Sequence, residues 1–209
     1  MVMKVMNGSD DARGDEFVVE SGTGTTASTY CQASIGESTM EIKFTTGASP
    51  LGSVVVAATD RGVCAISLRE SEAGAEESLR ARFPRAEISR DDAGLERALD
   101  IVRDRIAGRK LDAEVPLDLQ GTDFQREVWN QLLAIPPGST RSYLDVAQAI
   151  NRPKATRAVA QACGANPVAV VVPCHRVVMS DGSLGGYSGL PGVKKALLTA
   201  EGGWVPDRN

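Results

Sequence analysis

Residues 170–178 read Val-Val-Val-Pro-Cys-His-Arg-Val-Val, which places the chain's single histidine directly after a cysteine. The β-branched run before this pair predicts a buried strand. A cysteine is a strong nucleophile only as the thiolate, and a neighbouring histidine can remove its proton. Cys174 and His175 are therefore a candidate nucleophile and base. From the dipeptide alone, a buried core thiol beside an ordinary surface histidine is an equally good interpretation.

Three further motifs surround this stretch. Residues 152–159 read Arg-Pro-Lys-Ala-Thr-Arg-Ala-Val, residues 166–167 read Asn-Pro and residues 186–189 read Gly-Tyr-Ser-Gly. With Pro-Cys-His-Arg-Val at 173–177, they resemble the DNA-reading helix, asparagine hinge, active-site loop and acceptor site of the O6-alkylguanine-DNA alkyltransferases. That family includes the C-terminal half of the bacterial Ada protein. The ordered series covers residues 122–201, with a weaker match back to about Met40.

The resemblance implies a DNA-repair transferase whose cysteine takes an alkyl group from O6-alkylguanine in double-stranded DNA and keeps it. Cys174 would be the acceptor, and His175 would act on it through a water molecule. Glu201 would orient the histidine as the acid of a triad does, and Asn166 would join the DNA-binding helices to the thiol turn. Tyr143 would press on the flipped nucleotide and donate a proton toward guanine N3. Because a thioether does not leave easily, each molecule would act once.

The same resemblance implies groups that bind DNA and groups that line the base pocket. Arg157 would take the place of the flipped base in the stack, where a planar guanidinium fits. The rest of the DNA-binding set is Ala155, Thr156, Ala158, Arg152 and Lys154. The pocket set is Tyr187, Ser188, Val177 and Lys194, with Lys194 near the pocket mouth. As isolated residues, these alanines are also simply good helix formers.

Charge is distributed unevenly along the chain. The formal net charge is −4 and the pI about 5.2, which by themselves argue against nucleic-acid binding. Between Ser139 and Lys195, however, seven basic residues stand against only two acidic ones. This segregation predicts a basic face that can meet phosphates despite the acidic total.

Cysteine usage and hydropathy limit the remaining classes. The four cysteines form no C-x-x-C pair and no cluster with histidine, so we expect no metal site and no cofactor. No run of eighteen apolar residues occurs, and the N-terminus lacks a sustained apolar segment, so we expect neither a membrane span nor a secretory signal. Free thiols fit a reducing cytoplasm, at the nucleoid of a bacterium or in a eukaryotic nucleus. We expect a monomer.

The N-terminal half is predicted to hold a tail and a scaffold. Residues 1–38 are rich in Gly, Ser, Thr and Asp and read as a flexible linker. Residues 39–119 are expected to form one domain, in which apolar runs at 41–45, 54–58 and 63–68 predict a three-stranded antiparallel meander. Helices are expected over about 73–83 and 92–107. The resemblance implies a ribonuclease-H-like α/β fold for this domain.

The second domain, residues 120–209, is predicted to be mostly helical, which makes the whole chain α+β. Thr122 is a good N-cap for a helix that Pro136-Pro137-Gly138 would stop. Helices over about 143–150 and from 154 to about 165 read as a helix-turn-helix, of the winged-helix-like type by resemblance. On propensity alone this pair could be any α-hairpin.

Three other functions compete with alkyl transfer. A protein that only recognises or signals alkylated DNA would lack the acceptor cysteine, which is present here. A transcriptional regulator like full-length Ada would need a zinc domain and a second helix-turn-helix, and neither is visible. A Cys-His hydrolase seldom has its two catalytic residues adjacent in sequence. The range of alkyl sizes accepted and the repair of O4-alkylthymine stay open.

Overall fold

A computed structural model describes residues 39–109 and 113–202. Its first half contains one mixed sheet in the order β3-β2-β1-β4. The strands are β1 (Glu41–Ser49), β2 (Gly52–Thr59), β3 (Gly62–Arg69) and β4 (Glu87–Arg90). The three predicted strands are present and antiparallel to one another. The expected tail, residues 1–38, lies outside the described residues.

A fourth strand, β4, which the sequence did not predict, joins β1 in the parallel direction and makes the sheet mixed. Sequence patterns missed β4 because its four residues, Glu-Ile-Ser-Arg, include none that is fully buried. An edge strand of this kind carries little apolar periodicity. Its place is fixed by the register of its backbone, with Ile88 opposite Ile42.

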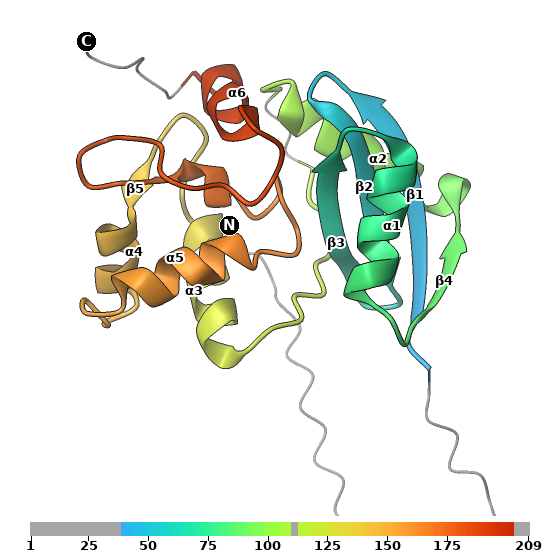
Figure 1. Cartoon of the computed structure of the whole chain (residues 1–209), viewed down its shortest axis with the longest axis horizontal. Coiled ribbons are helices and arrows are strands. Elements are labelled where there is room, and N and C mark those ends of the chain that lie inside the picture. Colours follow the sequence, from blue (N-terminus) through green and yellow to red (C-terminus); the bar gives the residue numbers. More distant parts are fainter. Residues whose placement is uncertain (1–38, 110–112, 203–209) are drawn as a thin grey trace, which may run out of the picture.

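One helix covers each face of this sheet (Figure 1). The helices are α1 (Glu72–Arg82) and α2 (Asp92–Ile106), close to the predicted ranges. The continuous apolar run in β2 divides between the faces: Val55 packs with the core under α1, while Val54 and Val56 pack with the core under α2. Because both faces are covered, the strand has no need of a polar side.

The second half is mostly helical, as predicted. Its elements are α3 (Asp123–Leu133), β5 (Arg141–Ser142), α4 (Tyr143–Ala149), α5 (Thr156–Gly164), a 3₁₀ turn (Cys174–Arg176), β6 (Val177–Val178) and α6 (Val193–Ala200). Thr122 caps α3 as expected, in a reciprocal capping box with Gln125. Trp129 of α3 is 1% exposed and donates from its indole nitrogen to the carbonyl oxygen of Ala162 in α5 at 2.8 Å. This bond fixes α5 against α3.

The valine run before Cys174 is a buried turn and not the predicted strand. Val170 has φ +71°, a left-handed backbone that is costly for a β-branched residue. The backbone N–H of Val172 donates to the carbonyl oxygen of Val168 at 2.9 Å, which closes the turn. The β-branched apolar pattern therefore predicted correctly that this run is buried, but it did not predict its backbone conformation.

This turn is tied to the sheet of the first half. Ile66 of β3 donates from its backbone N–H to the carbonyl of Pro167 at 2.8 Å and accepts from the N–H of Ala169 at 3.1 Å. The outer edge of β3, which has no neighbouring strand in the sheet, is thus paired with the segment that leads to Cys174. The sheet supports the position of the cysteine through this pairing.

Candidate active site

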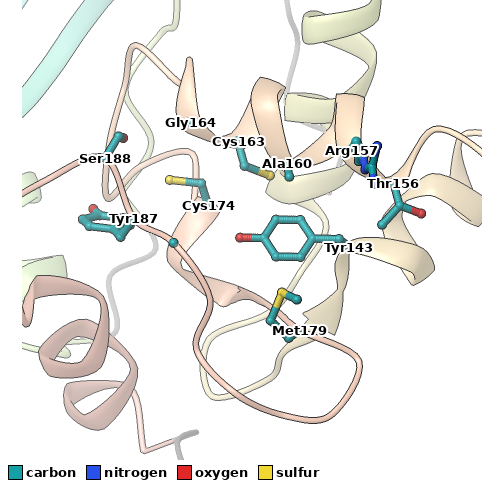
Figure 2. A pocket seen from close by; sticks show the side chains of 11 residues that line it. Tyr143, Thr156, Arg157, Ala160, Cys163, Gly164, Cys174, Met179, Tyr187 and Ser188 are labelled. Atoms are coloured by element: carbon teal, nitrogen blue, oxygen red, sulfur yellow. The ribbon is translucent and has the colours of Figure 1, made fainter.

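A cavity of about 440 Å³ opens between α4, α5 and the loop after β6. Cys174 lines it, together with the Tyr143, Tyr187 and Ser188 side chains (Figure 2). The remaining lining residues are Thr156, Arg157, Ala160, Cys163, Gly164, Met179 and Gly186. The structure therefore brings the predicted acceptor, one predicted DNA-binding arginine and two predicted pocket residues into one site.

Cys174 is 6% exposed, and burial raises the pKa of its thiol. The Asn166 side chain and the Lys194 ammonium act in the opposite direction. A second thiol, Cys163, lines the same cavity, and burial raises its pKa to about 12. Both thiols are therefore neutral at rest, and a base is needed to generate a nucleophile.

His175 is 1% exposed, and its Nε2 lies 2.9 Å from Oε1 of Glu201. Burial lowers the pKa of the imidazole, although Glu201 opposes this. Burial also works to raise the pKa of Glu201, but hydrogen bonds from His175 and Arg176 outweigh it and hold that pKa at about 2. A neutral imidazole beside an ionised carboxylate is the resting state of a general base.

The other ring nitrogen of His175, Nδ1, is buried and has no hydrogen-bond partner among the described residues. The carboxylate on Nε2 places the ring proton on that nitrogen, which leaves a lone pair on Nδ1. His175 therefore carries an available acceptor on the residue next to Cys174.

Asn166 lies between α5 and the thiol turn, as expected of a hinge. Its Nδ2 donates to the carbonyl of Val172 at 2.8 Å, and its Oδ1 accepts from the backbone N–H of Val168 at 3.0 Å. These two bonds span the turn that contains Val170. The side chain holds the strained turn closed.

The predicted DNA-binding residues lie in α5 and in the turn that precedes it. Arg157 and Thr156 line the cavity, and Arg157 is exposed (Figure 2). Lys154 and Arg152 are exposed in the turn before α5, where Arg152 pairs with Glu127 at 3.1 Å. Ala155 and Ala158 are half-buried.

Lys194 does not lie at the pocket mouth, as the sequence suggested, and is 4% exposed. Its ammonium donates to the carbonyls of Val177 at 2.6 Å and of Leu184, with a longer bond to Gly186 at 3.4 Å. Neither Lys194 nor Val177 is among the residues that line the cavity. The predicted basic face loses Lys194, and it also loses Arg176, which is half-buried and paired with Glu201.

Sequence reasoning missed two residues of the site. Met179 is 46% exposed and lines the cavity below the Tyr143 ring (Figure 2). A lone methionine after a valine pair gives no pattern that would have revealed this position. Arg176 was counted only as a basic residue, although its place beside His175 was a signal for a role in that pair.

No group of three or more metal-ligating side chains occurs within residues 39–109 and 113–202. No helix in that part of the chain is long and apolar enough to cross a membrane.

The comparisons with known proteins agree with this geometry. A family model described as "6-O-methylguanine DNA methyltransferase, DNA binding domain" matches residues 123–203. The methylated-DNA–protein-cysteine methyltransferase of Mycobacterium tuberculosis is 41% identical over 165 residues, covering 79% of this chain and 95% of that protein. A crystal structure of M. tuberculosis OGT in complex with DNA has a TM-score of 0.65 at 37% identity, covering 78% of this chain and 92% of that one.

Escherichia coli Ada, a bifunctional transcriptional activator and DNA repair enzyme, is 39% identical over 166 residues. The match covers 79% of this chain but only 47% of Ada, so the chain spans about half the length of that relative. The site combines a buried cysteine at a cavity beside the helix pair α4–α5 with a histidine that lies within hydrogen-bonding distance of a glutamate. The chain belongs to the methylated-DNA–protein-cysteine methyltransferase family.

Proposed function

We propose that this protein repairs alkylated double-stranded DNA by moving the alkyl group from guanine O6 to its own Cys174. The observation that carries the proposal is the buried Cys174 at a cavity that the exposed Arg157 also lines, followed in sequence by a buried His175 that is hydrogen-bonded to Glu201. Binding without transfer, the rival function, is disfavoured because a nucleophile and base are both present.

In the proposed reaction His175 Nδ1 takes the thiol proton through a water molecule. The Cys174 sulfur then forms a bond to the alkyl carbon while the bond from that carbon to O6 breaks, and the electron pair stays on O6. Tyr143 donates a proton to guanine N3, so that the base leaves neutral, and the imidazolium restores the tyrosine proton. The pKa of Tyr143 is raised by burial, which keeps its hydroxyl protonated until then.

The pocket groups would recognise the flipped guanine. The backbone N–H of Ser188 would donate to O6, and the Tyr187 ring would line the base. The Val177 carbonyl, predicted to accept from the guanine amine, instead accepts from Lys194 at 2.6 Å, and Val177 does not line the cavity. We therefore assign Lys194 the task of holding this loop in shape and not a contact at the pocket mouth.

A base in the duplex must leave the stack before it can reach Cys174. We propose that α4 and α5 act as a helix-turn-helix of the winged type, with Arg157 in the vacated space. Thr156, Ala155 and Ala158 would approach the groove, while Arg152 and Lys154 would meet phosphates. The first half, residues 39–119, would be a ribonuclease-H-like scaffold for the second, residues 120–209.

We propose that the protein acts as a monomer, once per molecule, and uses neither a metal nor a cofactor. The described cysteines, Cys64, Cys163 and Cys174, are free thiols, which suits a reducing cytoplasm. Transfer of a labelled methyl group from O6-methylguanine duplex to protein tests the proposal. We expect incorporation to level off at one group per molecule. Multiple turnovers, or retention of the label on DNA, would contradict it.

Changing Arg157 to alanine should slow transfer from duplex DNA by roughly threefold to thirtyfold, since the contact of a guanidinium with a π face is worth ~0.5–2 kcal/mol. Reaction with a free O6-alkylguanine base should be unchanged, because no base has to be flipped. Arg85→Ala, at an exposed position between α1 and β4, is the matched control. Equal losses on both substrates would show that Arg157 does not serve base flipping.

A further inference from the structure

Arg176 is the one residue of the Cys174–Arg176 turn that the proposed mechanism does not use. Its side chain is 11% exposed. Its Nε donates to both carboxylate oxygens of Glu201, at 3.2 Å and 3.0 Å, and a terminal nitrogen donates to Oε1 at 2.8 Å. The other terminal nitrogen donates to the carbonyl of Ile135. The guanidinium is committed to these two partners.

We propose that Arg176 is a positioning residue that fixes Glu201 and divides its negative charge, so that His175 stays a neutral base at physiological pH. This inference rests on the proposed alkyl transfer. It adds a fourth member to the cysteine, histidine and glutamate set.

His175 and Arg176 both contact the same carboxylate oxygen of Glu201. Oε1 of Glu201 lies 2.9 Å from Nε2 of His175 and 2.8 Å from the terminal nitrogen of Arg176. A carboxylate that faced only the imidazole would stabilise the imidazolium fully. One that also faces a guanidinium stabilises it less, because part of its charge is already neutralised.

A guanidinium suits this position better than an ammonium would. Its planar fork can bond two carboxylate oxygens together and still reach a third acceptor. The two partners also lie at helix ends, since Ile135 follows α3 and Glu201 is the C-cap of α6. Positive charge is favoured at both ends by the helix dipoles. Arg176 thus joins α3 to the end of the helix that supplies Glu201.

The other charged groups near His175 and Glu201 do not replace the effect of Arg176 on the pKa of His175. Lys194 of α6 and Arg176 both lower the pKa of His175, after burial, while Glu201 raises it. Arg105 of α2 also interacts with Glu201 and Arg176, but it is balanced in part by Glu114. Removing the charge of Arg176 leaves Glu201 free to stabilise the imidazolium, so the pKa of His175 should rise.

The test is the pH dependence of the single-turnover rate with a free O6-alkylguanine base, which avoids effects on DNA binding. As the pH is lowered, we expect the single-turnover rate of Arg176→Met to begin to fall at a higher pH than that of the native protein. The rate at pH 6 should drop about tenfold, with little change at pH 9. Arg176→Lys keeps the charge and should leave the acid side near that of the native protein.

A loss of equal size at every pH, or no loss, would overturn the proposal. Absence of any transfer by the native protein would instead reject the proposed function. Because the chain has one histidine, its imidazole proton resonance gives a second readout. That resonance should titrate at higher pH in Arg176→Met than in the native protein and Arg176→Lys. If the methionine variant does not fold, Arg176→Gln is titrated, and an unchanged midpoint there also overturns the proposal.

Discussion

Replacing His175 with glutamine is expected to lower the rate of alkyl transfer at pH 7 by roughly 10²–10⁴-fold, the usual contribution of a general base. Glutamine can still donate to Glu201, but it cannot accept the thiol proton. Burial raises the pKa of Cys174, so without a base very little thiolate forms at neutral pH. Single-turnover kinetics on O6-methylguanine DNA measure the effect.

The pH profile supplies the control for this variant. Raising the pH should restore much of the lost rate, because hydroxide then ionises the thiol directly. Affinity for DNA should not change, since His175 is 1% exposed and cannot touch the duplex. A rate within about threefold of the native value at pH 7 would rule out the histidine as the base.

Replacing Lys194 with methionine is expected to reduce the free energy of unfolding by roughly 2–4 kcal/mol, because the Val177 and Leu184 carbonyls lose a charged donor. It should also slow transfer. The ammonium lowers the pKa of Cys174, and its loss leaves the thiol harder to ionise. Urea denaturation and single-turnover kinetics measure the two effects separately.

Lys195→Met is the matched control, because Lys195 is exposed on the same helix. A surface change of this kind should alter stability by less than about 0.5 kcal/mol. Equal stability of the two variants would show that Lys194 does not hold the loop.

The resemblance to the alkyltransferase motifs predicted the set Cys174, His175 and Glu201. The structure places His175 and Glu201 within hydrogen-bonding distance, and the chemistry of the set stays a prediction. The turn at Val170 could not be predicted, because β-branched residues favour strands and only the Asn166 bonds and the pairing with Ile66 explain its shape. Tertiary contacts outweighed local preference there.

Charge was the least informative signal at the level of single residues. Arg176 and Lys194 contributed to a predicted basic face, yet Lys194 is buried, Arg176 is half-buried, and both are bonded to acceptors within the protein. A count along the sequence cannot tell an arginine that faces phosphate from one that pairs with a carboxylate. The same limit hid the strand β4, whose polar residues gave no apolar pattern.

The most direct test of the account is the intact mass of the protein after incubation with O6-methylguanine duplex, followed by peptide mapping. The native chain and Cys163→Ala should each gain about one methylene, located on residue 174, while Cys174→Ala should gain none. Cys163 is a fair comparison because it lines the same cavity with a pKa near 12. A methyl group on Cys163, or a mass gain by Cys174→Ala, would contradict the assignment of Cys174 as the acceptor.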